Sequence, residues 1–93
     1  MNVIALIGES VKKGVSELYG IEVSDSQLNI SLTRKEFEGD YTVVTFPFVK
    51  AAKKAPDAVG QELGAYLTEQ VDVITGFNVI KGFLNLSLSD KLW

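Results

Sequence analysis

The stretch Gly82-Phe83-Leu84-Asn85-Leu86-Ser87-Leu88 decides the fold of this chain of 93 residues. After the glycine, aromatic or polar residues alternate with leucine, which is typical of a β-strand with one buried face. The leucines share one face, and Phe83, Asn85 and Ser87 share the other. A ring and an amide on one face can stack on a flat ligand and hydrogen-bond to its edge, as RNA-binding proteins do with unstacked bases.

Two interpretations of the ring and the amide stay open. In the first, Phe83 folds over the preceding turn and packs on Tyr41 or Phe77, while Asn85 is merely solvated. Single aromatic residues at protein surfaces are common, so the spacing alone favours this interpretation. In the second, Phe83 and Asn85 are exposed together on an uncharged face and contact a nucleotide base. Only the second interpretation predicts a function.

Outward from this strand, apolar spacing predicts three helices and three further strands. Pro47 and Pro56 suit the first turns of two helices, and Lys81-Gly82 forms a hairpin turn. The expected elements, in chain order, are a helix over 2–20 capped by Asn2 and ended by Gly20, a loop over 21–26, a strand over 27–33, a charged turn over 34–40, a strand over 41–46, a helix over 47–54, a helix that begins at Pro56 and carries an apolar stripe to Val71, and strands over 77–80 and 83–88.

This order of elements indicates an α+β fold with two layers, in which a small antiparallel β-sheet has helices packed on one face. Gly60 and Gly64 lie on the third helix, where each costs about 1 kcal/mol relative to alanine. We expect them to permit a close approach of this helix to the sheet. The outer face of the sheet then carries small polar side chains and one ring, namely Asn29, Ser31, Thr33, Phe83, Asn85 and Ser87.

The chain contains no cysteine and no histidine, which excludes disulfides, thiolate nucleophiles, the usual zinc sites and histidine bases. The carboxylates Glu36, Glu38 and Asp40 alternate in a turn, where no buried environment would separate their pKa values. We therefore expect no catalytic residue, no metal site and no cofactor in this chain.

The net charge of −3 is unusual for a free-standing RNA-binding domain, because phosphate neutralisation supplies most of the affinity of such domains. Lys50 and Lys54 lie one helical turn apart with Lys53 beside them. They form either a solvated helix face or an edge that contacts phosphates. If the domain binds nucleic acid, another part of the protein must supply most of the binding energy.

No apolar run approaches the roughly 20 residues that span a bilayer, so we expect no membrane association. Met1-Asn2-Val3 lacks the basic residues that open a signal peptide, which favours a cytoplasmic protein. Ser89-Asp90 is a plausible helix cap, and the apolar end Leu92-Trp93 suggests that the chain belongs to a longer protein.

The sequence resembles the N-terminal domain of arginyl-tRNA synthetases over essentially its whole length. The matching residues occur in the order and approximate spacing of that family: Phe37, Gly39-Asp40-Tyr41, Ala52-Lys53-Lys54, Pro56 and Gly82-Phe83-Leu84-Asn85. The sequence departs from the family pattern where Glu38 is inserted, and at Ile80-Lys81-Gly82, where the family often has Gly-Pro-Gly.

The resemblance implies that residues 1–93 are a single non-catalytic domain appended to a class I ligase. Such a ligase attaches arginine to tRNA(Arg) with ATP and Mg, and is expected to be a monomer. The domain would contact the D-loop at the outer corner of the tRNA. Phe83 and Asn85 match the family's aromatic and amide positions near a D-loop base. The remaining residues expected to contact tRNA are Ser87, Lys50, Lys53 and Lys54.

Two other function classes stay open. A small α+β regulatory or protein-interaction domain would use the open sheet face to bind another domain, and Phe83 would then be buried at a protein contact. An independent small enzyme is less compatible with the sequence, because no pair of nucleophile and base can be assembled.

Overall fold

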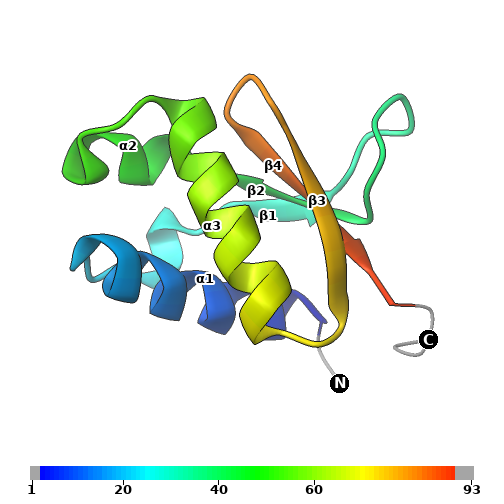
Figure 1. Cartoon of the computed structure of the whole chain (residues 1–93), viewed down its shortest axis with the longest axis horizontal. Coiled ribbons are helices and arrows are strands. Elements are labelled where there is room, and N and C mark those ends of the chain that lie inside the picture. Colours follow the sequence, from blue (N-terminus) through cyan, green and yellow to red (C-terminus); the bar gives the residue numbers. More distant parts are fainter. Residues whose placement is uncertain (1–2, 90–93) are drawn as a thin grey trace.

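A layer of helices covers one face of a β-sheet in the computed structural model, which describes residues 3–89 (Figure 1). The sequence-based prediction of an α+β fold with two layers is confirmed. The elements in chain order are α1 (Val3–Tyr19), the short 3₁₀ helix η1 (Asp25–Gln27), β1 (Ile30–Leu32), β2 (Tyr41–Val44), α2 (Phe46–Ala52), α3 (Pro56–Gln70), β3 (Ile74–Ile80) and β4 (Phe83–Leu88).

The sheet is antiparallel throughout and has the strand order β1-β2-β4-β3, so the last strand of the chain lies inside the sheet. Leu84 lies opposite Val43 on β2 and Val79 on β3. Residues directly opposite each other share a face, and this face is the one that the helices cover. The buried apolar core consists of Ile7, Val11, Val15, Val43, Phe48, Val59, Leu63, Leu67, Ile74, Leu84, Leu86 and Leu88.

Helix α3 packs closely on the sheet at its two glycines, as the sequence predicts. A Cβ atom on Gly60 would lie 2.8 Å from Cγ1 of Val79, and one on Gly64 would overlap the ring of Phe77. Neither position can accept a side chain without moving β3. The two glycines therefore set the distance between the helix and the sheet.

The boundaries of several elements differ from those predicted. The strand predicted over 27–33 begins only at Ile30, because Ser24 and Gln27 form a capping box that holds η1: the Ser24 N–H donates to Gln27 Oε1 at 3.1 Å. The helix predicted over 47–54 begins one residue earlier and ends at Ala52, since Lys53 adopts a left-handed conformation with φ 58°. Strand β3 begins at Ile74 rather than at 77. The features predicted at Asn2, Asp90 and the last residues lie outside the described range.

The turn between β3 and β4 is fixed by contacts with the starts of α2 and α3. Lys81 and Gly82 have φ angles of 50° and 82°, as a two-residue type I′ hairpin turn requires. The hydroxyl of Thr45 donates to the carbonyl oxygen of Gly82 at 2.6 Å, and the Gly82 N–H donates to Oδ1 of Asp57 at 2.8 Å. The first residue of β4, Phe83, is thereby held in place relative to both helices.

Between residues 3 and 89, no helix combines the length and the hydropathy needed to cross a lipid bilayer.

Candidate nucleic-acid interface

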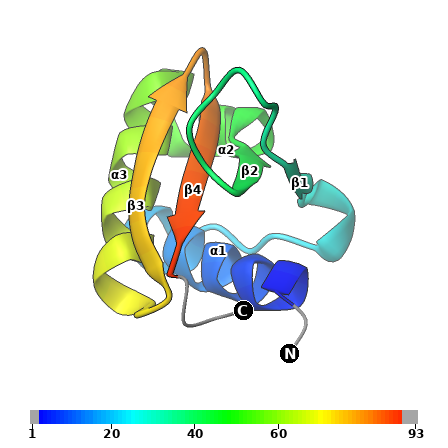
Figure 2. The same cartoon turned by 90° about the vertical axis from the view of Figure 1, so that its right-hand side faces the viewer.

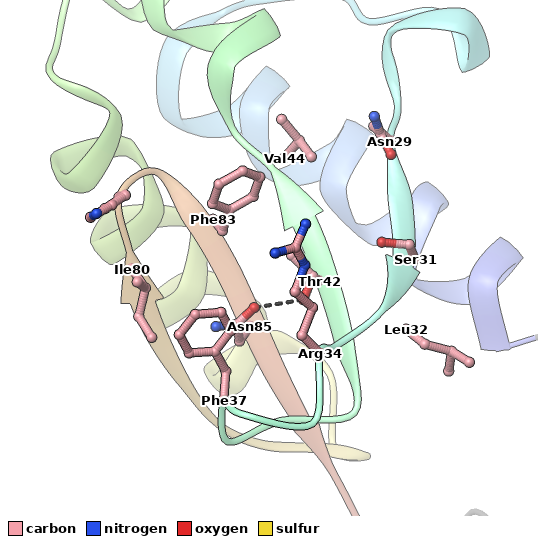
Figure 3. Close-up of a pocket in the computed structure, with 11 residues that line it drawn as sticks. Asn29, Ser31, Leu32, Arg34, Phe37, Thr42, Val44, Ile80, Phe83 and Asn85 are labelled. Atoms are coloured by element: carbon pink, nitrogen blue, oxygen red, sulfur yellow. Dashed lines mark hydrogen bonds between the residues drawn. The ribbon is translucent and has the colours of Figure 1, made fainter.

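The sheet face opposite the helices carries an open pocket of about 450 Å³. Figure 2 shows this face toward the viewer, with the loop between β1 and β2 arching in front of the strands. The pocket is lined by strand residues, by that loop and by the hairpin tip, and Figure 3 shows these side chains: Asn29, Ser31, Leu32, Arg34, Phe37, Thr42, Val44, Ile80, Lys81, Phe83 and Asn85.

The ring of Phe83 lies at this pocket and is 41% exposed. Its one aromatic neighbour among the described residues is Phe46, at the start of α2, whose ring centroid lies 5.8 Å away in an edge-to-face arrangement. Tyr41 and Phe77 both lie opposite Leu86 and therefore belong to the helix-covered face. The first interpretation, in which Phe83 packs on Tyr41 or Phe77, is therefore wrong.

Asn85 is not exposed beside the ring as the second interpretation supposed, since only 1% of it is accessible. The hydroxyl of Thr42 donates to Oδ1 of Asn85 at 2.6 Å, and Nδ2 of Asn85 donates to Oδ1 of Asn78 at 2.9 Å. The loop of residues 34–40 covers the amide, and a Cβ atom on Gly39 would lie 3.1 Å from Cβ of Asn85. Fewer side chains of the outer sheet face are therefore accessible to solvent than the sequence predicts.

Asn85 lines the floor of the pocket, although its amide is almost fully covered. An amide group has two N–H donors and two acceptor lone pairs, and one of each is used by Asn78 and Thr42. One donor and one acceptor remain. That Asn85 contacts a base stays a prediction.

Ser87 lies further along β4, opposite Gly76, and does not line the pocket. Its backbone carbonyl accepts a hydrogen bond from the hydroxyl of Thr75 at 3.3 Å. The structure therefore does not bring Ser87 together with Phe83 and Asn85.

The three predicted lysines have different surroundings, and none of them lines the pocket. Lys50 and Lys53 are exposed and form no salt bridge within residues 3–89. Lys54 pairs with Glu62 of α3 at 2.6 Å, and its ammonium lies 5.9 Å from the ring centroid of Tyr19 on α1. Lys54 thus joins elements of the helix layer.

Glu62 also accepts a hydrogen bond from the hydroxyl of Tyr19 at 2.6 Å. The hydrogen bond from Lys54, followed by that from Tyr19, lowers the pKa of the Glu62 carboxyl below its ordinary value. Partial burial and the bond to Glu62 raise the pKa of Tyr19. These three residues form a polar contact between helices, on the side away from the pocket.

The charged residues that line the pocket are Arg34 and Lys81, and both are basic. The sequence interpretation missed them because they lie in turns, outside the helical lysine cluster. Their positions beside the ends of β1 and β3 are the signal that could have identified them. A domain of net charge −3 therefore has a locally basic pocket on its outer face.

Comparisons with known proteins agree with this architecture. The family model described as arginyl tRNA synthetase N terminal domain matches residues 5–88. An arginine–tRNA ligase of Parabacteroides distasonis is 46% identical over 80 residues, which are 86% of this chain and 13% of the ligase. One from Bacteroides fragilis is 46% identical over 84 residues, which are 90% of this chain and 14% of the ligase.

A solved arginyl-tRNA synthetase from Thermus thermophilus superposes with a TM-score of 0.79 at 25% identity, covering 98% of this chain and 15% of that one. The chain thus spans about one seventh of the length of the proteins that it resembles. The extent of the family match and the shared fold lead to one assignment. The chain belongs to the family of arginyl-tRNA synthetase N-terminal domains.

Proposed function

We propose that residues 1–93 form the N-terminal domain of a longer arginine–tRNA ligase, and that the outer sheet face contacts the D-loop at the outer corner of tRNA(Arg). The observation that carries the proposal is the exposed ring of Phe83 at a pocket whose charged lining residues are Arg34 and Lys81. An aromatic platform with a basic rim suits an unstacked base and its phosphate.

In this proposal the domain binds and the rest of the ligase catalyses. Stacking of Phe83 on a base contributes about 1–3 kcal/mol. In the proposal Asn85 hydrogen-bonds to the base edge, and the tRNA contacts of Ser87, Lys50, Lys53 and Lys54 lie outside the pocket. ATP with Mg and arginine bind elsewhere in a monomeric, cytoplasmic enzyme. Covalent linkage to the other tRNA-binding parts raises the effective concentration of this acidic domain near the tRNA.

The test is steady-state aminoacylation by the full-length ligase with Phe83→Ala. We expect the KM for tRNA to rise about 5-fold or more, since one base stack is lost, and the KM values for ATP and arginine to stay unchanged. Leu18→Ala, which removes a similarly exposed apolar side chain from α1, is the matched control. An unchanged KM for tRNA in the Phe83 variant would reject the proposed role of the ring.

A protein-interaction domain is the second candidate, because Phe46 (50% exposed) packs beside Phe83 and Leu32 (74% exposed) lines the same pocket from the edge strand β1. NMR shift mapping of the labelled chain with unlabelled tRNA separates the two candidates. Perturbations centred on Phe83 and Arg34 support the tRNA-contacting domain. Perturbation of these residues by the remainder of the ligase, and not by tRNA, supports the interaction domain.

A further inference from the structure

We propose that the loop between β1 and β2 forms the second wall of the nucleotide site. Phe37 contacts the same base as Phe83, from the other end of the pocket, and Arg34 contacts the phosphate of that nucleotide. The inference rests on the proposed function and adds residues that the sheet face alone would not supply. Figure 3 shows Phe83 toward one end of the pocket and Phe37 toward the other, where the Phe37 ring overlaps Asn85 in this view.

The loop is held against the sheet by a continuous line of hydrogen bonds. The Thr42 hydroxyl donates to Asn85, and the Asn85 amide donates to Asn78. Nδ2 of Asn78 then donates to the carbonyl oxygen of Glu38, in the loop, at 2.7 Å. Asn85 lies buried in the middle of this line at the floor of the pocket, and Asn78 is the member that bonds to the loop.

Asp40 provides a second attachment of the loop, which joins its end to β4. Its N–H donates to the carbonyl oxygen of Leu86 at 2.7 Å, and its Oδ2 accepts from the N–H of Leu88 at 2.8 Å. Within the loop, the Phe37 N–H donates to the carbonyl oxygen of Arg34 at 3.0 Å. The side chains of Phe37 and Arg34 are thus presented by a loop whose backbone is fixed to β4.

The loop residues at the pocket have the chemistry that a nucleotide requires. The ring of Phe37 is 37% exposed and lines the pocket, and Arg34 forms no salt bridge within residues 3–89. Glu36 and Glu38 belong to the same loop but do not line the pocket. The volume of about 450 Å³ lies within the range of small-ligand sites. The Phe37 ring and the Arg34 guanidinium therefore line the pocket, whereas the carboxylates of Glu36 and Glu38 do not.

The first experiment measures tRNA binding by the full-length ligase with Phe37→Ala, Phe37→Leu and Arg34→Gln. Both Phe37 variants should weaken tRNA binding about 5-fold or more, because leucine keeps the apolar volume but lacks the π face that stacks. Arg34→Gln should reduce the slope of log Kd against log salt by about 0.7, the value for one phosphate contact to a single strand. Leu18→Ala and Lys13→Gln on α1 are the matched controls. Wild-type affinity of Phe37→Leu would overturn the stacking role.

The second experiment uses tRNA transcripts that each lack one D-loop base. If both rings contact one base, the transcript that abolishes the effect of Phe83→Ala also abolishes the effect of Phe37→Ala. Suppression of the two variants by different transcripts, or no effect of Phe37→Ala, would overturn the inference and leave the proposed function standing. If Phe83→Ala has no effect on any transcript, the proposed function itself fails.

Discussion

Gly82 determines how the ring of Phe83 is presented. Its φ of 82° belongs to the region that favours glycine, and an added Cβ atom would lie 2.8 Å from Cβ of Pro56 and 3.0 Å from Cζ of Phe46. Phe46 is also the edge-to-face neighbour of Phe83. One residue therefore allows the tight turn and the close packing of α2 against the start of β4.

Gly82→Ala should destabilise the chain by about 1–3 kcal/mol, since it adds backbone strain and a steric overlap. Urea unfolding of the 93-residue chain measures the change. Gly76→Ala is the matched control, because Gly76 has no positive φ and its added Cβ would meet nothing within 4 Å. Equal stability of the two variants would contradict this account of the turn.

Asn85 illustrates what local sequence can predict about a single residue. Alternation along 83–88 assigns the faces of β4 correctly, since the side-chain period of a strand is a local property. The burial of Asn85 depends instead on Gly39 and Asn78, which reach it from other segments. Arg34 and Lys81 were missed for the same reason: only the folded loop and hairpin bring them to one pocket.

At the level of elements, the loop of residues 34–40 depends on a side chain from a distant strand. Asn78 of β3 bonds both to Asn85 and to the carbonyl of Glu38, so it connects the sheet to the loop. Loss of that side chain would leave both partners without these hydrogen bonds.

Asn78→Ala should therefore destabilise the chain by about 1 kcal/mol or more. It should also speed amide hydrogen exchange at Phe37 and Asp40, whose N–H groups are bonded within the loop and to β4. NMR-detected exchange measures both amides. Asn29→Ala removes an exposed asparagine from the segment before β1 and should leave these rates unchanged. Unaltered exchange in the Asn78 variant would show that the loop does not need this contact.

The contact of Tyr19 on α1 and Glu62 on α3 with Lys54, in the turn between α2 and α3, should make stability depend on pH. The pKa of Glu62 is lowered in the folded state, so its stabilisation is complete above its ordinary pKa of 4.5 and is lost as pH falls through the folded-state value. Glu62→Gln should lose less stability than the wild type between pH 7 and pH 3. Urea unfolding at both pH values measures this, with Glu69→Gln as control. An equal loss in the wild type and the Glu62 variant would contradict the pairing.

Elements with a strong local period were predicted well. The apolar stripe of α3 and the alternation of β4 place both elements within about two residues of their observed bounds. Strand β1 is shorter than predicted because the Ser24–Gln27 capping box competes with extended backbone. Helix α2 begins at Phe46, one residue before the proline that signalled it.

For the whole molecule, the net charge of −3 repels a polyanion, whereas the basic residues at the pocket attract it. Long-range repulsion of a polyanion acts on the entire domain, whereas Arg34 and Lys81 act over about one Debye length. In the proposed function, the domain would therefore contact RNA that other parts of the protein already hold.

Removal of residues 1–93 from the full-length ligase should raise the KM for tRNA and leave the KM values for ATP and arginine unchanged. Micromolar free chain added back should not restore the KM, because tethering supplies an effective concentration in the millimolar range. Aminoacylation kinetics measure both effects. Recovery with equimolar free chain would show that the domain binds tRNA strongly by itself.

The central place of β4 in the order β1-β2-β4-β3 has a consequence for synthesis on the ribosome. The three helices and β1–β2 emerge first, and the inner edge of β2 has no partner until residues 83–88 leave the exit tunnel. The same strand supplies Phe83. The nascent domain therefore completes its sheet and acquires its aromatic surface in one late step, and a chain interrupted before that step would have an unpaired edge prone to aggregation.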